Sequence, residues 1–291
     1  MNSWKAASGA CRLLKGDIRM WGLSTFTYPW AFGISGYFPP KPLLPEELFK
    51  RAHNFGAQVV QIGHNVPLHT LTEEKLQEIK GLAQRYNVVL EIGTLSIREP
   101  HLLTCLRIAE QLEARFVRTL LDAPDDSPSL GEAEREIRSV LPHFAAKNIY
   151  LVLENYERRR SEELLFLFRT VNHPYLRFCF DTANSLGAFE NPRDVLRAMV
   201  SYTMNVHLKE VVSFRPPYQL GFIVEGRPLG KGALGIEWVF EMLEGRHDVS
   251  YIIELLTPWQ NSIESTIARE AEWAEESARF LKEFLGRKGI S

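Results

Sequence analysis

The chain alternates short apolar runs with longer stretches of helical periodicity. The runs are rich in β-branched and aromatic residues and predict eight strands, over Met20–Tyr28, Gln58–Asn65, Val88–Thr94, Phe116–Asp122, Ile149–Tyr156, Arg177–Asn184, Met204–Glu210 and Tyr251–Pro258. Between them, apolar side chains recur every three or four residues, as from Leu76 to Tyr86, which predicts helices. Strand and helix therefore alternate along the whole chain.

This alternation indicates the fold class. Near-continuous apolar strands such as Tyr150–Leu153 are typical of a parallel sheet that helices cover. Repeated strand and helix units of this number predict an α/β protein with a single-domain (β/α)8 TIM barrel over residues 20–291. A doubly wound open sheet is the alternative, but Gly33 and Gly36 lack the G-x-G-x-x-G spacing that it would need. Residues 1–19 precede the first strand and are expected to be an N-terminal extension or an over-extended start.

Composition and charge narrow the range of partners. The 291 residues include 34 Lys and Arg against 36 Asp and Glu, a net charge of −2 that gives no general reason to bind nucleic acid or an anionic membrane. No apolar run approaches the roughly 20 residues of a membrane span. The three cysteines form no C-x-x-C pair, which disfavours a thiolate zinc site or a disulfide framework. We expect a cytoplasmic protein with a small-molecule partner, no nucleic acid and no membrane.

Four residues with metal-binding side chains stand at the ends of the last four predicted strands. They are Glu154, Asp181, His207 and Glu254. Each follows an apolar stretch, where a buried carboxylate needs a positive partner. The carboxyl ends of barrel strands meet at one face, so we expect the four side chains to share one divalent ion; unrelated ion pairs are the alternative. Carboxylate oxygens with one imidazole nitrogen suit Mn²⁺, Mg²⁺ or Co²⁺ better than structural zinc.

The spacing of these four residues also carries a resemblance. With the strings Leu-Glu-Asn, Asp-Thr-Ala-Asn and His-Leu-Lys-Glu, it resembles the sugar phosphate isomerase/epimerase family of xylose isomerase-like barrels, over about residues 20–286. The resemblance implies one divalent ion, Mn²⁺ ahead of Mg²⁺, Co²⁺ and Zn²⁺, bound by all four residues. It implies an isomerase or epimerase of a sugar, sugar acid or related polyol derivative, in which Glu154 and Glu254 exchange protons with the substrate. A homo-oligomer stays open.

The implied chemistry is physically consistent. A proton beside a carbonyl is removed slowly because the enediolate stores negative charge, which a metal chelating the substrate oxygens stabilises. Glu154 and Glu254 come from well-separated strands, so they can approach a carbon from two directions and invert it, whereas proton return on one face gives isomerisation.

Other functions stay open. The resembling family contains inosose and 3-dehydroshikimate dehydratases, which makes a lyase the nearest alternative. A phosphodiesterase acting on abasic DNA would need a richer set of metal ligands and a basic face. A non-catalytic sugar-binding protein is the third alternative, and retention of both glutamates argues against it.

Two departures from the family pattern concern substrate binding. The frequent His-x-Lys-Asp string here ends in Glu210 and keeps Lys209, which strand alternation places on the same side as His207, within reach of an oxyanion or phosphate. A substrate-binding histidine that often follows the metal aspartate is Asn184 here, a hydroxyl ligand or a helix cap. Both residues are candidate substrate contacts, with structural roles as the alternative.

Long connections after strands supply the other candidates. The segments Pro29–Pro45 and Val211–Leu234 are aromatic and Pro-rich, and we expect them to be loops that wall the pocket. Arginines of the second segment are candidates for binding a carboxylate or phosphate, and the tryptophans for packing on a sugar's apolar face. The remaining candidate substrate contacts are His64, Trp30, Trp259, Arg215, Phe222 and Arg227.

Overall fold

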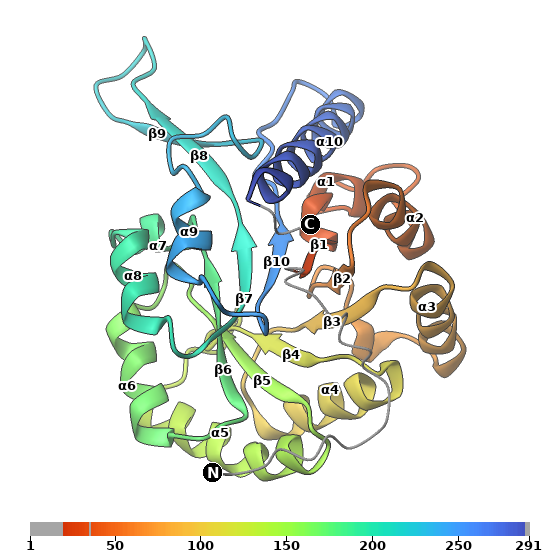
Figure 1. Cartoon of the computed structure of the whole chain (residues 1–291), viewed down its shortest axis with the longest axis vertical. Coiled ribbons are helices and arrows are strands. Elements are labelled where there is room, and N and C mark those ends of the chain that lie inside the picture. The colour runs from red at the N-terminus through yellow and green to blue at the C-terminus, as the bar shows by residue number, and fades with distance from the viewer. Residues whose placement is uncertain (1–19, 35, 289–291) are drawn as a thin grey trace.

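The computed structural model describes residues 20–34 and 36–288 and shows, within them, eight parallel strands closed into a barrel (Figure 1). The strands neighbour one another in the order β1-β10-β7-β6-β5-β4-β3-β2. They are β1 (Met20–Ser24), β2 (Val59–Ile62), β3 (Val89–Gly93), β4 (Phe116–Thr119), β5 (Tyr150–Glu154), β6 (Leu176–Asp181), β7 (Thr203–Leu208) and β10 (Ser250–Ile253). Every predicted strand is present, which confirms the single-domain (β/α)8 barrel. The predicted extension over residues 1–19 lies outside the described residues and stays a prediction.

Helices surround the barrel (Figure 1). They are α1 (Pro29–Phe32), α2 (Pro45–Phe55), α3 (Glu73–Tyr86), α4 (Glu99–Leu112), α5 (Leu130–Ala146), α6 (Ser161–Val171), α7 (Asn184–Gly187), α8 (Pro192–Met199), α9 (Glu237–Met242) and α10 (Ile263–Arg287), with the short 3-10 turns η1 (Thr25–Thr27) and η2 (Leu68–Thr70). Hydroxyl side chains cap several of them. The Ser129 hydroxyl accepts a hydrogen bond from the backbone of Glu132, whose carboxylate in turn accepts one from the Ser129 backbone.

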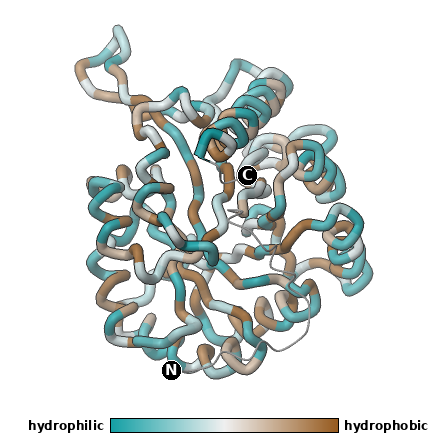
Figure 2. Tube along the Cα trace, viewed as in Figure 1, coloured by the Kyte–Doolittle hydropathy of each residue, from teal (hydrophilic) through white to brown (hydrophobic). Residues whose placement is uncertain are grey.

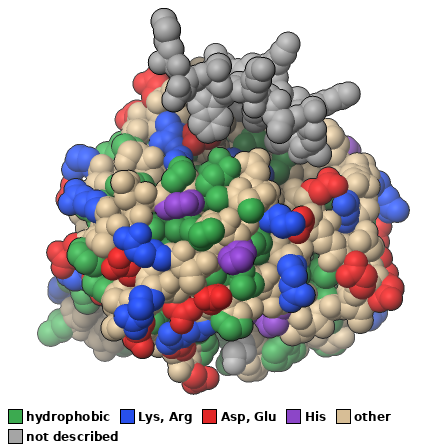
Figure 3. Space-filling model, turned by 90° about the horizontal axis from the view of Figure 1, so that it is seen from below, with side chains coloured by type: hydrophobic (Ala, Val, Ile, Leu, Met, Phe, Trp, Pro, Cys, Tyr) green, Lys and Arg blue, Asp and Glu red, His purple; other side chains and the backbone are tan. Residues whose placement is uncertain are grey.

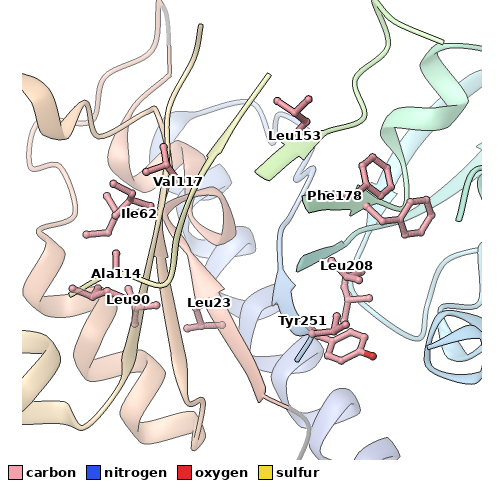
Figure 4. Packing of buried hydrophobic residues seen from close by; sticks show 14 of the residues in the cluster. Leu23, Ile62, Leu90, Ala114, Val117, Leu153, Phe178, Leu208 and Tyr251 are labelled. Carbon is pink, nitrogen blue, oxygen red and sulfur yellow. The ribbon is translucent and has the colours of Figure 1, made fainter. Parts of the chain in front are cut away.

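Alternation along the strands separates two sets of buried side chains. Residues such as Leu23, Ile62 and Leu208 pack into the large core between the strands and the helices (Figure 4). A smaller cluster, which includes Val152 and Cys179, forms separately from that core. Figure 2 shows the same division, with hydrophobic segments along the strands and alternating hydropathy along the helices. Because side chains two apart share one face of a strand, Glu154 and Asp181 project to the same side as Val152 and Cys179, away from the helices.

An irregularity aligns two of the predicted ligands. The pairing of β6 with β7 shifts between Phe178 and Cys179, after which Asp181 stands opposite His207. Bulges often occur beside functional sites because they redirect a side chain. Here the shift brings the ends of the two strands into register.

The connection Val211–Leu234 is not the loop that its Pro-rich composition predicts. Most of it is an antiparallel hairpin of β8 (Glu210–Phe214) and β9 (Ile223–Arg227), which extends away from the barrel (Figure 1). The prediction gave too little weight to the β-branched residues that flank the turn. The Glu210 carboxylate holds the base of the hairpin by accepting hydrogen bonds from the backbone N–H groups of Leu234 at 3.1 Å and Gly235 at 2.9 Å.

Among the described residues, no helix is both long enough and apolar enough to span a bilayer. On the face drawn in Figure 3, basic and acidic side chains are interspersed rather than segregated. A mixed surface of this kind produces no strong field of one sign over that face.

Candidate active site

The four predicted metal ligands lie together at the carboxyl ends of β5, β6, β7 and β10. His207 Nδ1 stands 3.2 Å from Glu154 Oε1, 3.7 Å from Asp181 Oδ2 and 3.5 Å from Glu254 Oε2. All four side chains are buried. One imidazole nitrogen therefore faces an oxygen of each carboxylate, and we call these residues the four-residue cluster.

A hydrogen bond to Gln61 in the barrel interior fixes the orientation of the His207 ring. Its Nε2 donates to Gln61 Oε1 at 2.8 Å. Gln61 cannot turn its amide around freely, because its Nε2 donates to Asn205 Oδ1 at 3.1 Å and to Glu91 Oε2 at 3.3 Å. A proton on Nε2 leaves the lone pair of Nδ1 available toward the carboxylates, which is how metal-binding histidines are commonly oriented.

The field at His207 is strongly negative. Burial by itself lowers the pKa of His207, but the carboxylates of Glu254 and Glu154 outweigh burial, and the pKa lies well above its usual value. The negative field that favours a proton on Nδ1 also attracts a metal cation, which would displace that proton and take up the Nδ1 lone pair.

Asp181 divides its two oxygens between the backbone and Lys209. Its Oδ1 accepts hydrogen bonds from the backbone N–H groups of Ala183 and Asn184, both at 2.9 Å. Its buried Oδ2 makes no well-directed hydrogen bond among the described residues, although Lys209 Nζ lies 2.6 Å away. Burial alone would raise the pKa of Asp181, but Lys209 and His207 outweigh it, so the group is ionised. Oδ2 faces His207, so it is placed to bind a cation in exchange for its contact with Lys209.

The two glutamates divide their oxygens between the cluster and its surroundings. Glu154 Oε1 faces His207 and accepts from Asn184 Nδ2 at 3.2 Å, while Oε2 faces Arg118 Nη1 at 3.2 Å. Glu254 Oε1 accepts from the Ser24 hydroxyl at 3.0 Å, while Oε2 faces His207 and Lys209. Each carboxylate thus has one oxygen directed at His207 and one held by a neighbour.

These residues fit a divalent metal. Asp181, His207 and Glu254 offer donor atoms that all lie within 4.8 Å of one another, as do Glu154, Cys179 and His207. Ligand atoms at roughly 2.0 to 2.3 Å from one ion have separations of this order. Cys179 is a poor ligand, because burial raises the pKa of its thiol to about 12 and keeps it neutral. Glu154, Asp181, His207 and Glu254 are therefore the residues that would hold the ion.

Two predicted substrate contacts stand beside the cluster. Lys209 Nζ lies 2.6 Å from Asp181 Oδ2 and 3.2 Å from Glu254 Oε2. Asn184 Nδ2 contacts Glu154 Oε1 and also donates to the Asn155 carbonyl at 3.1 Å. Their predicted roles toward substrate stay predictions.

Other predicted contacts gather on neighbouring loops. The His64 ring lies 4.8 Å from the Phe26 ring, and its buried Nδ1 has no hydrogen-bond partner among the described residues. Burial, with a smaller effect from Arg118, lowers the pKa of His64 to about 3. Trp30 and Trp259 have ring centroids 5.6 Å apart. The two tryptophans come from the connections after β1 and β10, so the barrel brings them together.

The hairpin residues form a separate group. Phe222 is 69% exposed, and the Arg215 guanidinium stacks over its ring with 5.0 Å to the centroid. Arg227 contacts Glu225 and the Gly226 carbonyl within the same hairpin. The structure thus gives these three residues neighbours in β8, β9 and their turn, and not in the four-residue cluster.

Three further residues contact the cluster directly and were not predicted from the sequence: Arg118, Gln61 and Ser24. Each lies on a barrel strand and is buried. A signal was present, because a charged or amide side chain within an apolar strand needs a buried polar partner. A polar residue within an apolar strand therefore predicts a buried polar partner, but the sequence does not identify that partner.

A closed parallel barrel with three carboxylates and a histidine at its carboxyl face defines a class of barrel in which the functional site lies on the strand ends. Within that class, the chain belongs to the xylose isomerase-like TIM barrel family, whose profile matches residues 49–284. Among the proteins to which it is similar are a decarboxylase and an epimerase.

A curated relative and two solved structures extend this comparison. The chain is 30% identical over 261 residues to the 3-oxo-isoapionate decarboxylase of Pectobacterium atrosepticum, covering 89% of this chain and 94% of the relative. The D-psicose 3-epimerase of Clostridium cellulolyticum, solved with D-tagatose, is 13% identical with a TM-score of 0.69, covering 94% of this chain and 99% of the epimerase. A Mycobacterium smegmatis barrel in complex with magnesium is 14% identical with a TM-score of 0.62, covering 90% and 97%. At these identities, the two structures show the fold alone.

Proposed function

We propose that the chain is a metal-dependent isomerase or epimerase that transfers protons on a sugar, sugar acid or related polyol derivative. The observation that supports this most is the convergence of Glu154, Asp181 and Glu254 on Nδ1 of His207. When bound there, a divalent ion would polarise a substrate carbonyl and stabilise the charge of an enediolate. Mn²⁺ is the ion we propose first, ahead of Mg²⁺, Co²⁺ and Zn²⁺.

The two glutamates are the proposed proton carriers. β5 and β10, which position Glu154 and Glu254, are separated in the barrel by β6 and β7. The carboxylates therefore approach the centre from different directions, so one can remove a proton from carbon and the other can return one. Asp181 is held by two backbone N–H groups and serves to fix the ion.

Decarboxylation is a second candidate, favoured by the relative that acts as a 3-oxo-isoapionate decarboxylase. Loss of CO₂ from a 3-oxo acid moves the electrons of the broken carbon–carbon bond onto the carbonyl oxygen. The product is the same kind of enolate, and it needs only one proton at carbon. A barrel built for proton transfer therefore requires little change to release CO₂.

One experiment separates the two candidates. Mn²⁺-loaded protein is incubated in deuterated water with ketoses, sugar acids and 3-oxo sugar acids, with deuterium incorporation followed by NMR and CO₂ measured in the same samples. Exchange at carbon without CO₂ supports the isomerase or epimerase, and CO₂ with one deuterium retained in the product supports the decarboxylase. The control is chelator-treated protein. If protein shown to hold Mn²⁺ produces neither signal, the proposed function is wrong.

A further inference from the structure

We propose that Arg118 forms a carboxylate-binding subsite beside the four-residue cluster, so that the substrate is an oxo acid and not a neutral ketose. This inference rests on the proposed function and names its substrate class. It assigns the anion-binding role to the barrel interior, and not to Arg215 or Arg227 on the hairpin.

The barrel makes room for the Arg118 guanidinium. Arg118 is 2% exposed and pairs in register with Gly93 of β3. A Cβ at position 93 would lie 2.6 Å from Arg118 Nη2 and 2.9 Å from its Cζ, closer than such atoms approach. The glycine thus leaves the space that the guanidinium fills, with Nη1 3.2 Å from Glu154 Oε2.

Arg118 has hydrogen-bonding capacity to spare. A guanidinium carries five N–H donors. Its ion pair with Glu154 Oε2 uses Nη1, and its buried Nε has no hydrogen-bond partner among the described residues. Arg177 also has an unpartnered Nε, but its side chain is 21% exposed and its partner Asp248 is not a predicted ligand, whereas the Arg118 side chain is 2% exposed and pairs with Glu154. A buried guanidinium with unused donors is suited to a planar anion.

The net charge of the metal-loaded site would favour a ligand with one negative charge. Among the described residues of the cluster and its direct contacts, Glu154, Asp181 and Glu254 face the cations Arg118 and Lys209. With a neutral histidine, these three carboxylates and two cations have a net charge of one negative. A bound divalent ion would change the net charge to one positive. A substrate with a single carboxylate neutralises the remainder, whereas a phosphate dianion would exceed it.

The geometry sets the distance between the carboxylate and the carbonyl of the substrate. Glu154 separates the two places, since its Oε1 is 3.2 Å from His207 Nδ1 and its Oε2 is 3.2 Å from Arg118 Nη1. Arg118 and His207 thus contact the two oxygens of one carboxylate, so a ligand that reaches both places must be short. Short oxo acids, with the carboxylate one or two bonds from the carbonyl, match this arrangement.

Two probes of equal length test the subsite. Hydroxypyruvate and dihydroxyacetone share a hydroxyketone and differ in a carboxylate against a hydroxymethyl group, and dihydroxyacetone phosphate supplies the phosphate arm. Their binding to Mn²⁺-loaded protein is measured by calorimetry for the wild type, Arg118→Met, Arg118→Lys and the control Arg177→Met. We expect the wild type to prefer hydroxypyruvate, Arg118→Met to bind it about a hundredfold more weakly, and the other two ligands to change by less than about threefold. Arg177→Met should match the wild type.

The outcomes are distinct. Arg118→Lys keeps the charge but not the planar donors, so a loss of about tenfold in hydroxypyruvate affinity is expected even where Arg118→Met does not fold. Unchanged hydroxypyruvate affinity in either folded variant overturns the subsite, as does a wild type that prefers dihydroxyacetone or its phosphate. Failure to bind Mn²⁺ counts instead against the proposed function. Deuterium exchange on neutral ketoses, with no preference for the acid, leaves the proposed function standing and removes the subsite.

Discussion

Gln61 Oε1 accepts a hydrogen bond from Nε2 of His207 at 2.8 Å, which directs the opposite nitrogen of the imidazole at three carboxylates. The relationship links the middle of β2 to the end of β7, across the barrel interior. It means that the donor set at the carboxyl face depends on an amide whose hydrogen bonds go to His207, Asn205 and Glu91 and not to the carboxylates of that set.

Gln61→Leu should therefore weaken metal binding without removing a ligand. The change leaves Nε2 of His207 without its acceptor, and loss of such an outer partner typically lowers metal affinity by about tenfold to a hundredfold. Calorimetric titration with Mn²⁺ measures the effect. Gln58→Leu, one residue before the same strand, is the matched control and should bind Mn²⁺ as the wild type does. Equal affinities for both variants would show that the hydrogen bond does not orient the ligand.

Glu154→Gln and Glu254→Gln should each reduce solvent deuterium exchange by at least about a hundredfold, the lower range for general acid–base catalysis. The amide keeps the shape of the side chain but cannot accept a proton at neutral pH. Exchange is followed by NMR at Mn²⁺ concentrations that saturate each variant, because metal loss would otherwise mimic the effect. If one fully loaded variant retains exchange near that of the wild type, proton transfer uses the other glutamate alone.

Gly232→Ala should destabilise the base of the hairpin. A Cβ at position 232 would lie 2.0 Å from Glu210 Oε2, so the Glu210 side chain requires glycine opposite to it. Overpacking of this kind costs roughly 1 to 3 kcal/mol in the free energy of unfolding. The double variant Gly232→Ala with Glu210→Asp should recover part of the loss, since the shorter acid withdraws from the new methyl group. Additive losses in denaturant unfolding would contradict a direct clash.

Glu270 should make stability depend on pH. Its buried carboxylate accepts hydrogen bonds from the backbone N–H groups of Trp30 and Ala31, both at 3.0 Å, and burial raises its pKa to about 8. The folded state therefore holds a proton that the unfolded state releases above about pH 4.5. This contribution to stability is complete below that pH and is lost as the pH rises through about 8.

The comparison is with Glu270→Gln, which has no such proton. Between about pH 5.5 and about pH 8.5, the free energy of unfolding of the wild type should fall by roughly 2 to 4 kcal/mol more than that of the variant. Denaturant titrations at the two pH values measure the difference. Parallel pH profiles would show that the folded and unfolded states bind protons at position 270 equally.

Sequence periodicity was sufficient for the barrel, because each strand is apolar and each intervening helix has a clear face. The cluster was predictable for a related reason: Glu154, Asp181 and His207 end buried strands, and parallel strands place such ends together. The hairpin was not predicted, because its paired strands lie in a Pro-rich and aromatic segment. Arg118 could not be assigned either, since its position over Gly93 depends on a pairing between β3 and β4 that the one-dimensional pattern does not contain.

The most direct test of the metal site is a crystal of the wild-type protein grown with MnCl₂ and measured for manganese anomalous scattering. The account predicts one anomalous peak at roughly 2.0 to 2.3 Å from His207 Nδ1 and from an oxygen of each of Glu154, Asp181 and Glu254. Asp181→Asn, which keeps the side-chain shape but removes a charge, should weaken or abolish the peak. A wild-type map with no peak at this position, and with Lys209 still paired to Asp181 and Glu254, would contradict the account.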